Sequence, residues 1–525
     1  MSNFVKGSRC SCSLSQLFVF AVLVLLAALL RFYGLGTWSF DRDEIATKIE
    51  CRYFFEHQPL PDSIKGHPCY HPEEEKSQFC RLPRLVCAAS FVHWIDCRIF
   101  GEDEFGSRFL MAVMGSLSVG IAFLLGRSLF GFSGSLILAL LILLSPEHVY
   151  NSQNARFYCQ AFLMIEIVLL LGGHVAVNRS LFAAICLGPA AIIMVLSHSL
   201  TVLIWGILFL GLLIDFFLTR EPDRESKNQF ATKIPRKLVL ILCAWSIVIF
   251  LIVLVHIMPL SQSWNQFETR ISPLDSVLTF AFIFGRPYLI LCFPAWVWAL
   301  LSFRNAGQTY WLFVSLACGT VILLLPLKII FYQWYGILFA FPLFVILAMF
   351  INHIGQLLTC SHQQYGRYCA LVWCCFALLL NIAALRNYYK GGDRYDYRSA
   401  CRYIEQHWQP GDRLICHDGT EIIHQYLPQH DVPTSLWAKQ SKEWLLSLFD
   451  PNKPEKDDPS CGRYWLILKR EIYFAFSEEV REWIDRHGQR QSHFGASRYE
   501  EPRVLDVFLC SPQPFGLTPA RPANP

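Results

Sequence analysis

The stretch LFVFAVLVLLAALLRFYGLGTWSFDRDEIATKIE (residues 17–50) decides how this chain is organised. It is apolar up to Arg31, and three acids, Asp41, Asp43 and Glu44, follow close behind. A helix that crosses a bilayer needs about 20 mostly apolar residues, so the run predicts a first membrane span. Carboxylates crowded beside a membrane are costly to keep ionised, because like charges repel and lipid does not solvate them. We therefore place the chemistry of the chain in this acidic segment, against the plainer interpretation of a solvated loop.

Composition assigns the chain to the membrane proteins. Of its 525 residues 54% are hydrophobic and only 16% are charged, whereas an average soluble protein carries roughly a quarter charged residues. The net charge of +4 is small and argues against a nucleic-acid partner. Many of the 20 cysteines lie in apolar runs, where a thiol behaves as a small buried hydrophobe. The candidates for disulfides are Cys51, Cys69, Cys80, Cys401, Cys416, Cys461 and Cys510, whose pairing the sequence does not give.

Apolar runs of spanning length predict a polytopic α-helical membrane protein with about 11 spans. A twelfth run, residues 85–100, is broken by His93, Asp96 and Arg98, so it predicts an amphipathic helix along the interface. The predicted spans lie near residues 15–33, 108–126, 134–150, 157–173, 180–197, 201–218, 238–257, 283–302, 310–327, 335–352 and 368–385.

Lysine and arginine in the short loops predict the orientation. They concentrate in alternate connections, above all in residues 220–237, which places the N-terminus inside and residues 386–525 outside. The prediction is a transmembrane domain over residues 1–385, with a first external loop at 35–107, and a small soluble extracytoplasmic α/β domain over residues 386–525. In that second domain the pattern predicts helices at 398–408 and 478–488 and strands at 413–417, 464–469 and 504–510.

Three segments together resemble a known family of membrane enzymes. They are ALLRFYGLGTWSFDRDEIA, IFGEDEFGSRFLMAVMGSLSVGIAFLLGRSLFG and LLSPEHVYNSQNARFY, and they cover the first third of the chain. They are similar to the polytopic GT-C glycosyltransferases, which take a sugar from a polyprenyl-phosphate carrier. That class includes the protein O-mannosyltransferases and the aminoarabinose transferases of lipid A. The resemblance implies a transferase with an external soluble domain.

The resemblance implies that Asp43 and Glu44 are the catalytic acids. The acceptor must lose a proton as it attacks the anomeric carbon, and a positioned carboxylate can serve as the base. The phosphate leaving group needs a cation rather than an acid. Two carboxylates beside a phosphate also suit magnesium or manganese, so Asp43 and Glu44 are candidate metal ligands, although the sequence offers no dedicated cage.

The substrate- and phosphate-binding residues implied by the resemblance match the family pattern less closely than the two acids do. Relatives read Ser-Gln-Glu-Ala-Arg where this chain has Asn154 before Arg156, and Glu147 is the candidate that replaces the missing charge. The other candidates are Arg81 or Arg84 before the interfacial run, His198 after a span, and Lys328 near two tyrosines. Interfacial snorkelling is the plainer role for both arginines.

The sequence therefore predicts an inverting membrane glycosyltransferase that acts on the extracytoplasmic face, in a bacterial inner membrane. Its expected partners are a polyprenyl-phosphate sugar donor, a protein, lipid or glycan acceptor, and the bilayer itself. Two alternatives stay open. A secondary transporter would explain Pro189, Pro294 and Pro342 inside predicted spans. An inactive relative that binds cell-envelope glycan would explain Asn154.

Overall fold

A computed structural model describes residues 14–57, 88–198, 200–218, 236–256, 286–302, 307–324, 336–361, 379, 381–386, 388–389, 394–416, 420–430, 463–475, 478–494 and 504–510. The chain divides into two compact units. The helical unit comprises Met1–Leu35 and Gln78–Leu385, and the sheet unit combines Gly36–Ser77 with Arg386–Pro525. The first loop, predicted at residues 35–107 of the membrane domain, is thus divided between the two units.

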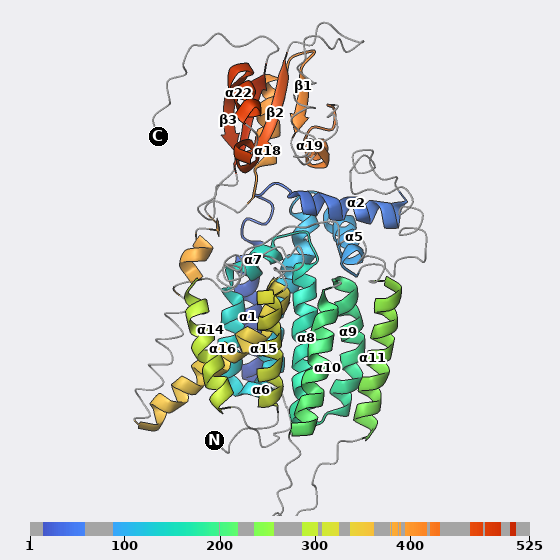
Figure 1. The fold of residues 1–525 in the computed structure, drawn as a ribbon, viewed down its shortest axis with the longest axis vertical. Helices are drawn as coiled ribbons and strands as arrows, with labels where there is room; N and C mark the ends of the chain where they lie inside the picture. The colour runs from blue at the N-terminus through green and yellow to red at the C-terminus, as the bar shows by residue number, and fades with distance from the viewer. Residues whose placement is uncertain are drawn as a thin grey trace, which may run out of the picture. The chain divides into compact units, whose positions relative to one another are not determined.

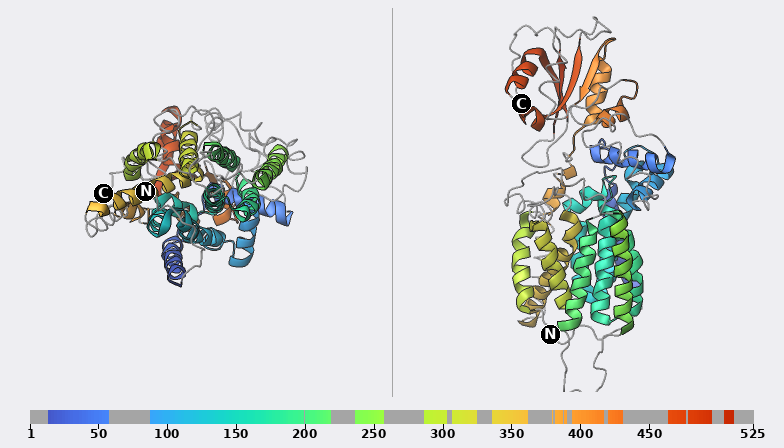
Figure 2. Two further views of the ribbon diagram at one scale, coloured as in Figure 1. Left: turned by 90° about the horizontal axis from the view of Figure 1, so that it is seen from below. Right: turned by 45° about the vertical axis from the view of Figure 1, so that its right-hand side comes forward.

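The helical unit is a bundle whose long helices run side by side (Figures 1 and 2). Its described elements are α1 (Leu14–Phe32), α5 (Ala88–Phe100), η1 (Gly106–Arg108), α6 (Phe109–Leu143), α7 (Pro146–Ser152), α8 (Tyr158–Asn178), α9 (Leu181–Ser197), α10 (Thr201–Leu218), α11 (Arg236–His256), α14 (Arg286–Ser302), α15 (Gln308–Leu324) and α16 (Ile337–Ser361). Apolar faces of these helices bury one another, and large apolar side chains such as Phe18 and Phe182 remain exposed at the surface of the unit. That surface matches a protein whose solvent is lipid.

Among the described residues, four helical stretches are long and apolar enough to cross a membrane: Leu14–Phe32, Gly106–Leu143, Tyr158–Asn178 and Ile337–Leu357. Five further apolar helices are shorter. The predicted count of about 11 spans is therefore not confirmed. The last predicted span, residues 368–385, lies mostly outside the described residues.

Helix α6 is two passes joined at a sharp bend. Gly131 has a left-handed φ of 73°, which glycine adopts without steric cost. Arg108, before the first pass, donates to Leu35 O at 3.1 Å, and Ile142, near the end of the second, accepts from Arg31 at 3.4 Å. A straight helix of this length would separate residues 108 and 142 by roughly 50 Å. The two predicted spans at 108–126 and 134–150 thus form a hairpin, although the second ends at Leu143, because Pro146 opens a separate helix, α7.

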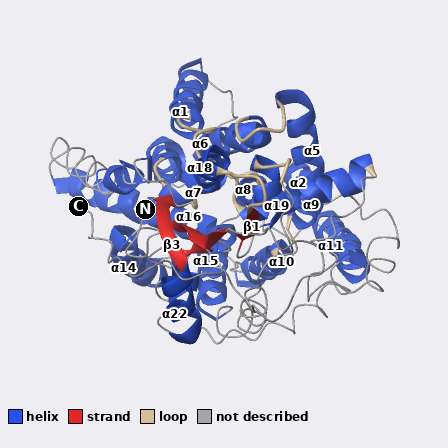
Figure 3. Cartoon of the chain, turned by 90° about the horizontal axis from the view of Figure 1, so that it is seen from above, coloured by secondary structure: helices blue, strands red, loops and turns tan. Residues whose placement is uncertain are grey.

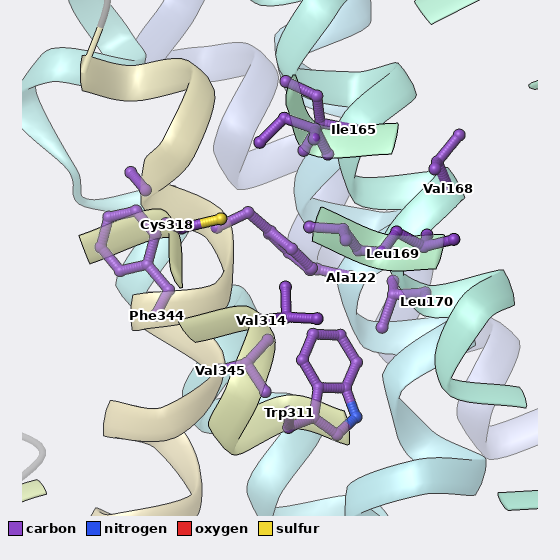
Figure 4. Packing of buried hydrophobic residues seen from close by; sticks show 14 of the residues in the cluster. Ala122, Ile165, Val168, Leu169, Leu170, Trp311, Val314, Cys318, Phe344 and Val345 are labelled. Atoms are coloured by element: carbon purple, nitrogen blue, oxygen red, sulfur yellow. The ribbon is translucent and has the colours of Figure 1, made fainter. Parts of the chain in front are cut away.

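The core of the helical unit lies between α6, α8, α15 and α16 (Figure 4). Trp311 of α15 is 2% exposed and packs edge-on against Phe130 of α6, with ring centroids 5.6 Å apart. Ala122, Leu169 and Val314 around it are fully buried. The helices run on through the prolines of α9, α14 and α16. The prolines that motivated the transporter alternative therefore do not end these helices.

One polar residue of α5, Asp96, serves a structural purpose. Asp96 is fully buried, and both of its carboxylate oxygens accept the Leu110 N–H, at 3.1 and 3.0 Å. Leu110 lies in the first turn of α6, where backbone N–H groups lack helical partners and favour a negative charge. Asp96, one of the polar residues that argued against residues 85–100 as a span, therefore caps the next helix. The interfacial placement of α5 stays a prediction.

The sheet unit is a small α/β fold, and among the described residues it holds every strand (Figure 3). The sheet has the order β1-β2-β4-β3; β1 and β2 are parallel, and the other two pairs are antiparallel. Its elements are α2 (Arg42–Glu56), α18 (Tyr397–His407), β1 (Arg413–Cys416), α19 (Thr420–Tyr426), β2 (Tyr464–Lys469), α21 (Arg470–Ala475), α22 (Glu478–His487), β3 (Gly488–Phe494) and β4 (Leu505–Cys510).

The core of the sheet unit joins distant parts of the chain. Phe40 and Ile45, from the segment after α1, pack in one cluster with Ile404 of α18 and with Trp465 and Ile467 of β2. Hydrogen bonds of Ser39 and Phe40 hold the first segment in addition to this apolar contact. Residues 36–57 thus fold with the C-terminal part of the chain.

Four of the seven candidate disulfide cysteines lie among the described residues of this unit, and none of them forms a disulfide: Cys51, Cys401, Cys416 and Cys510. Cys401 and Cys510 are buried, at 1% and 0% exposure, and neither is bonded to another cysteine. Burial raises the pKa of the Cys510 thiol to about 12, so it remains protonated at physiological pH. Cys69, Cys80 and Cys461 lie outside the described residues.

Candidate active site

The predicted catalytic acids open helix α2. The carbonyl oxygen of Asp41 accepts the N–H groups of Glu44 and Ile45, so helical bonding begins at Asp41. Glu44 then reaches back, and its Oε2 accepts the Asp41 N–H at 2.8 Å. The Glu44 side chain thus makes the N3 contact of a capping box, and acids in the first turn also complement the helix dipole. Asp43, between the two, is half-buried.

Glu44 is held in a buried ion pair. Its Oε2 lies 3.0 Å from Arg394 Nη1, and the two side chains are 0% and 2% exposed. An ionised carboxylate that accepts from a guanidinium and a backbone N–H at one oxygen is strongly stabilised in its charged form. Glu44 therefore has a structural role that sequence reasoning missed, because its partner lies 350 positions away. Of the two predicted acids, Asp43 is the one that is not fully buried.

The position of α2 is fixed by four further hydrogen bonds within the sheet unit. Ser39 Oγ donates to Tyr395 O at 2.6 Å and accepts the Tyr397 N–H at 3.2 Å. The Tyr426 hydroxyl accepts the Phe40 N–H at 2.7 Å. Lys48 donates to Gln425 Oε1 at 3.1 Å, and its ammonium also lies 4.7 Å from the centre of the Phe40 ring. The start of α2 is thereby held against the C-terminal residues.

The donor set at α2 does not fit the predicted magnesium or manganese ion. A hard divalent cation needs several oxygen ligands with available lone pairs. The Oε2 of Glu44 already accepts from Arg394 and from the Asp41 N–H. Among the described residues no group of three His, Cys, Asp or Glu side chains is gathered for a metal.

In the helical unit, the segment of residues 145–156 is a buried polar layer anchored to the end of α1. Arg31 Nη2 lies 2.8 Å from His148 Nδ1, and burial followed by the charge of Arg31 holds the pKa of His148 well below its usual range. The Gln153 amide donates to the carbonyl oxygens of Arg31 and Tyr33, at 2.9 and 2.8 Å. Ser145 caps α7 through its hydroxyl. The segment is therefore a fixed layer and not a mobile loop.

Two of the predicted binding residues lie in this layer. Glu147 is fully buried, and its Oε1 accepts from Asn151 Nδ2 at 2.9 Å. Asn154 is 5% exposed, and no hydrogen-bond donor among the described residues reaches its Oδ1. A buried amide oxygen without a donor is rare in proteins. It therefore marks a place where a water molecule or a substrate hydroxyl would be stabilised.

Arg156 and His198 are brought together by the fold. The Arg156 guanidinium lies 4.6 Å from the centre of the Phe157 ring, and His198 packs on that ring with centroids 4.7 Å apart. Burial, followed by the charge of Arg156, lowers the pKa of His198 to about 3. His198 Nδ1 accepts the Leu200 N–H at 3.1 Å, so the neutral ring carries its proton on Nε2. The pair is one fixed cation beside one neutral N–H donor.

Three of the predicted phosphate-binding residues, Arg81, Arg84 and Lys328, lie outside the described residues. The others divide between the units: Asp43 and Glu44 belong to the sheet unit, whereas Glu147, Asn154, Arg156 and His198 belong to the helical unit.

Comparison with known proteins gives structural matches only. No family model and no curated sequence matches the chain. Among solved structures it is similar to ArnT from Cupriavidus metallidurans in the apo state, with a TM-score of 0.51 and 13% identity over 95% of this chain and 98% of that one. The same enzyme bound to undecaprenyl phosphate matches with a TM-score of 0.50 at 12% identity, over 94% and 98%.

A second similar structure is the archaeal oligosaccharyltransferase AglB from Archaeoglobus fulgidus, in complex with an inhibitory peptide and a dolichol-phosphate. It matches with a TM-score of 0.52 and 12% identity, over 93% of this chain and 74% of that one. Sequence identities this low support a shared fold but not a shared activity. The resemblance predicted from the three sequence segments is confirmed at this level: the chain has the fold of the polytopic GT-C membrane glycosyltransferases.

Proposed function

We propose that this chain is a membrane glycosyltransferase that transfers a sugar from a polyprenyl-phosphate donor to a protein, lipid or glycan acceptor. The observation that carries the proposal is the shared fold, which extends over 95% of this chain and 98% of ArnT. The ArnT structure holds undecaprenyl phosphate, and the AglB structure holds a dolichol-phosphate and an inhibitory peptide. Both lipids present a phosphate on a long apolar chain, which suits a bundle with an apolar exterior.

In the proposed reaction Asp43 is the base. As the acceptor hydroxyl or amine attacks the anomeric carbon, its proton passes to the Asp43 carboxylate. The bond between the anomeric carbon and the phosphate oxygen breaks, and the electron pair leaves with the polyprenyl phosphate. Attack from the face opposite the leaving group inverts the anomeric centre. Glu44 is tied to Arg394, so its proposed contribution is to hold the first turn of α2, and with it Asp43, in place.

Arg156 is the described candidate for the cation that stabilises the leaving phosphate. A guanidinium presents several N–H donors that match phosphate oxygens. The neutral His198 beside it adds an Nε2–H donor without adding a second charge, because its pKa stays near 3. Arg81, Arg84 and Lys328 remain candidates from the sequence. We place this chemistry on the extracytoplasmic face of a bacterial inner membrane, following the loop charges.

A relative that binds glycan without transferring it is the second candidate. Two observations favour it: Asn154 cannot act as a base, and Glu44 is committed to Arg394. The enzyme would turn over a donor and the binding relative would not, so one protein preparation can distinguish the two functions.

The test uses the purified full chain in lipid nanodiscs with a panel of radiolabelled polyprenyl-phosphate sugars. The proposal predicts that at least one donor releases polyprenyl phosphate and passes its label to acceptors in an envelope extract. An Arg156→Gln variant should weaken donor binding, since the phosphate loses its cation. If no donor in the panel turns over while neutral glycans still bind, the chain is the binding relative and not the enzyme.

A further inference from the structure

The sheet unit carries a pocket that the proposed reaction does not use. Its volume is about 290 Å³, near the lower end of the roughly 300–1,000 Å³ typical of ligand pockets. Side chains from α21, α22, β3 and β4 line it, so all of its walls come from one compact unit. The size suits one sugar residue better than an extended ligand.

One side of the pocket is aromatic. Tyr473 of α21 and Phe508 of β4 stack with ring centroids 6.0 Å apart and planes 20° apart. Phe474, next to Tyr473, is 63% exposed although it is a large apolar residue. Phe474 therefore offers an exposed, flat apolar ring beside the half-buried Tyr473, and the planes of the two rings are 74° apart. A ligand with a face of C–H groups would cover it.

The other side is polar and carries no net charge. Arg470 is bound in a fork to Asp506, at 2.9 and 2.7 Å. Arg490 lies 3.8 Å from Asp506 with its side chain 57% exposed. Asp485 is exposed and accepts the Tyr473 hydroxyl at 2.6 Å. The pocket therefore offers guanidinium donors and carboxylate acceptors in equal number.

This balance selects against ionic ligands. A phosphate would meet two carboxylates, and an ammonium would meet two guanidinium groups, so each would be opposed by charges of its own sign. Neutral hydroxyl groups both donate and accept, which suits Arg490 and Asp485 together. The raised pKa of Tyr473, about 12, keeps its phenol protonated at physiological pH.

We propose that this pocket binds a neutral sugar residue of a glycan, with the C–H face of the sugar ring on Phe474 and its hydroxyls on Arg490 and Asp485. The inference goes beyond the proposed transfer, because binding here needs neither the lipid donor nor Asp43. It gives the sheet unit a role of its own as a glycan-binding module.

The test measures binding to the full chain in nanodiscs, without donor, by saturation-transfer NMR and by calorimetry. The probes are neutral disaccharides of glucose, galactose, mannose and N-acetylglucosamine, with inorganic phosphate as the anionic comparison. Phe474→Ala should weaken binding of the preferred disaccharide about tenfold, and Phe474→Tyr should restore it, since the ring makes the contact. Arg490→Gln should weaken it severalfold.

Arg402→Gln is the matched control, because Arg402 is an exposed arginine of α18 in the same unit and lies outside the pocket. It should bind like the parent protein. Binding of phosphate in place of any sugar, with the same loss in Arg490→Gln, would make the pocket an anion site and overturn the inference. Failure of every disaccharide, or equal binding by all four variants, would also overturn it. Neither outcome depends on whether the chain transfers sugar.

Discussion

The buried ion pair of Glu44 and Arg394 predicts that Glu44 has a structural role and not a catalytic one. The two side chains are 0% and 2% exposed and 3.0 Å apart. Removing one partner of such a pair strands a buried charge and typically destabilises by about 3–5 kcal/mol. Glu44→Gln and Arg394→Gln should each lower the local stability of α2 by about that amount. In hydrogen exchange this is a loss of protection of roughly two to four orders of magnitude.

The assay is hydrogen exchange with mass spectrometry on the intact chain in nanodiscs, read on peptides from α2 and α18. Glu50→Gln, an exposed acid on the same helix, is the matched control and should change stability by no more than about 0.5 kcal/mol. The double variant should lose less than the sum of the single ones, because no charge is left stranded. If Glu44→Gln keeps full protection yet abolishes transfer, Glu44 is catalytic and the structural assignment is wrong.

Two further substitutions test the helical unit. Asp96→Asn should match the parent protein near pH 4 and exceed its stability as the pH rises toward 8, by up to about 1.4 kcal/mol per pH unit. The reason is that burial raises the Asp96 pKa from 3.8 to about 7, so the parent protein loses the stability tied to the protonated carboxyl as the pH rises through that window. Unfolding curves measured across this pH range check the prediction. Equal pH dependence of the two proteins would contradict it. Gly115→Ala should lower the stability by about 1–3 kcal/mol, because the added Cβ would overlap Ser152 Oγ and lie 2.9 Å from Cys159 Sγ. Gly206→Ala, where the Cβ meets open space, is its control and should leave the melting temperature unchanged or higher; equal melting temperatures would refute the packing.

The apolar pattern predicted the elements that are buried. Residues 464–469 were predicted as a strand, and β2 has those bounds, because YWLILK is apolar throughout and forms a central strand. Strand β3 was not predicted, since its sequence, GQRQSHF, is polar. It lies at the edge of the sheet, and none of its residues is buried. Strand β3 forms because it pairs with β4, its one neighbour in the described sheet, and the sequence of β3 alone does not predict this pairing.

The candidate site was predictable only in part. The acids of residues 41–44 follow a predicted membrane span and are typical of the start of a helix. Helix α2 does begin there, at Arg42. The partner of Glu44 was not predictable, because Arg394 pairs across 350 positions through the fold of the sheet unit. The approach of Arg156 to His198 has the same cause, since it depends on how α8 and α9 pack. Sequence supplies the chemistry of such residues, and packing decides their neighbours.

The central claim is that Asp43 removes the acceptor proton, and Asp43→Asn tests it most directly. The substitution keeps the shape of the side chain and deletes the charge that accepts the proton. General-base catalysis contributes about 10²–10⁴-fold, so single-turnover transfer should fall by that factor while the affinity for the polyprenyl-phosphate donor stays unchanged. Protection of α2 in hydrogen exchange should match that of the parent protein, with Glu50→Gln as the active control. Transfer at the parent rate in a folded Asp43→Asn variant would contradict the account.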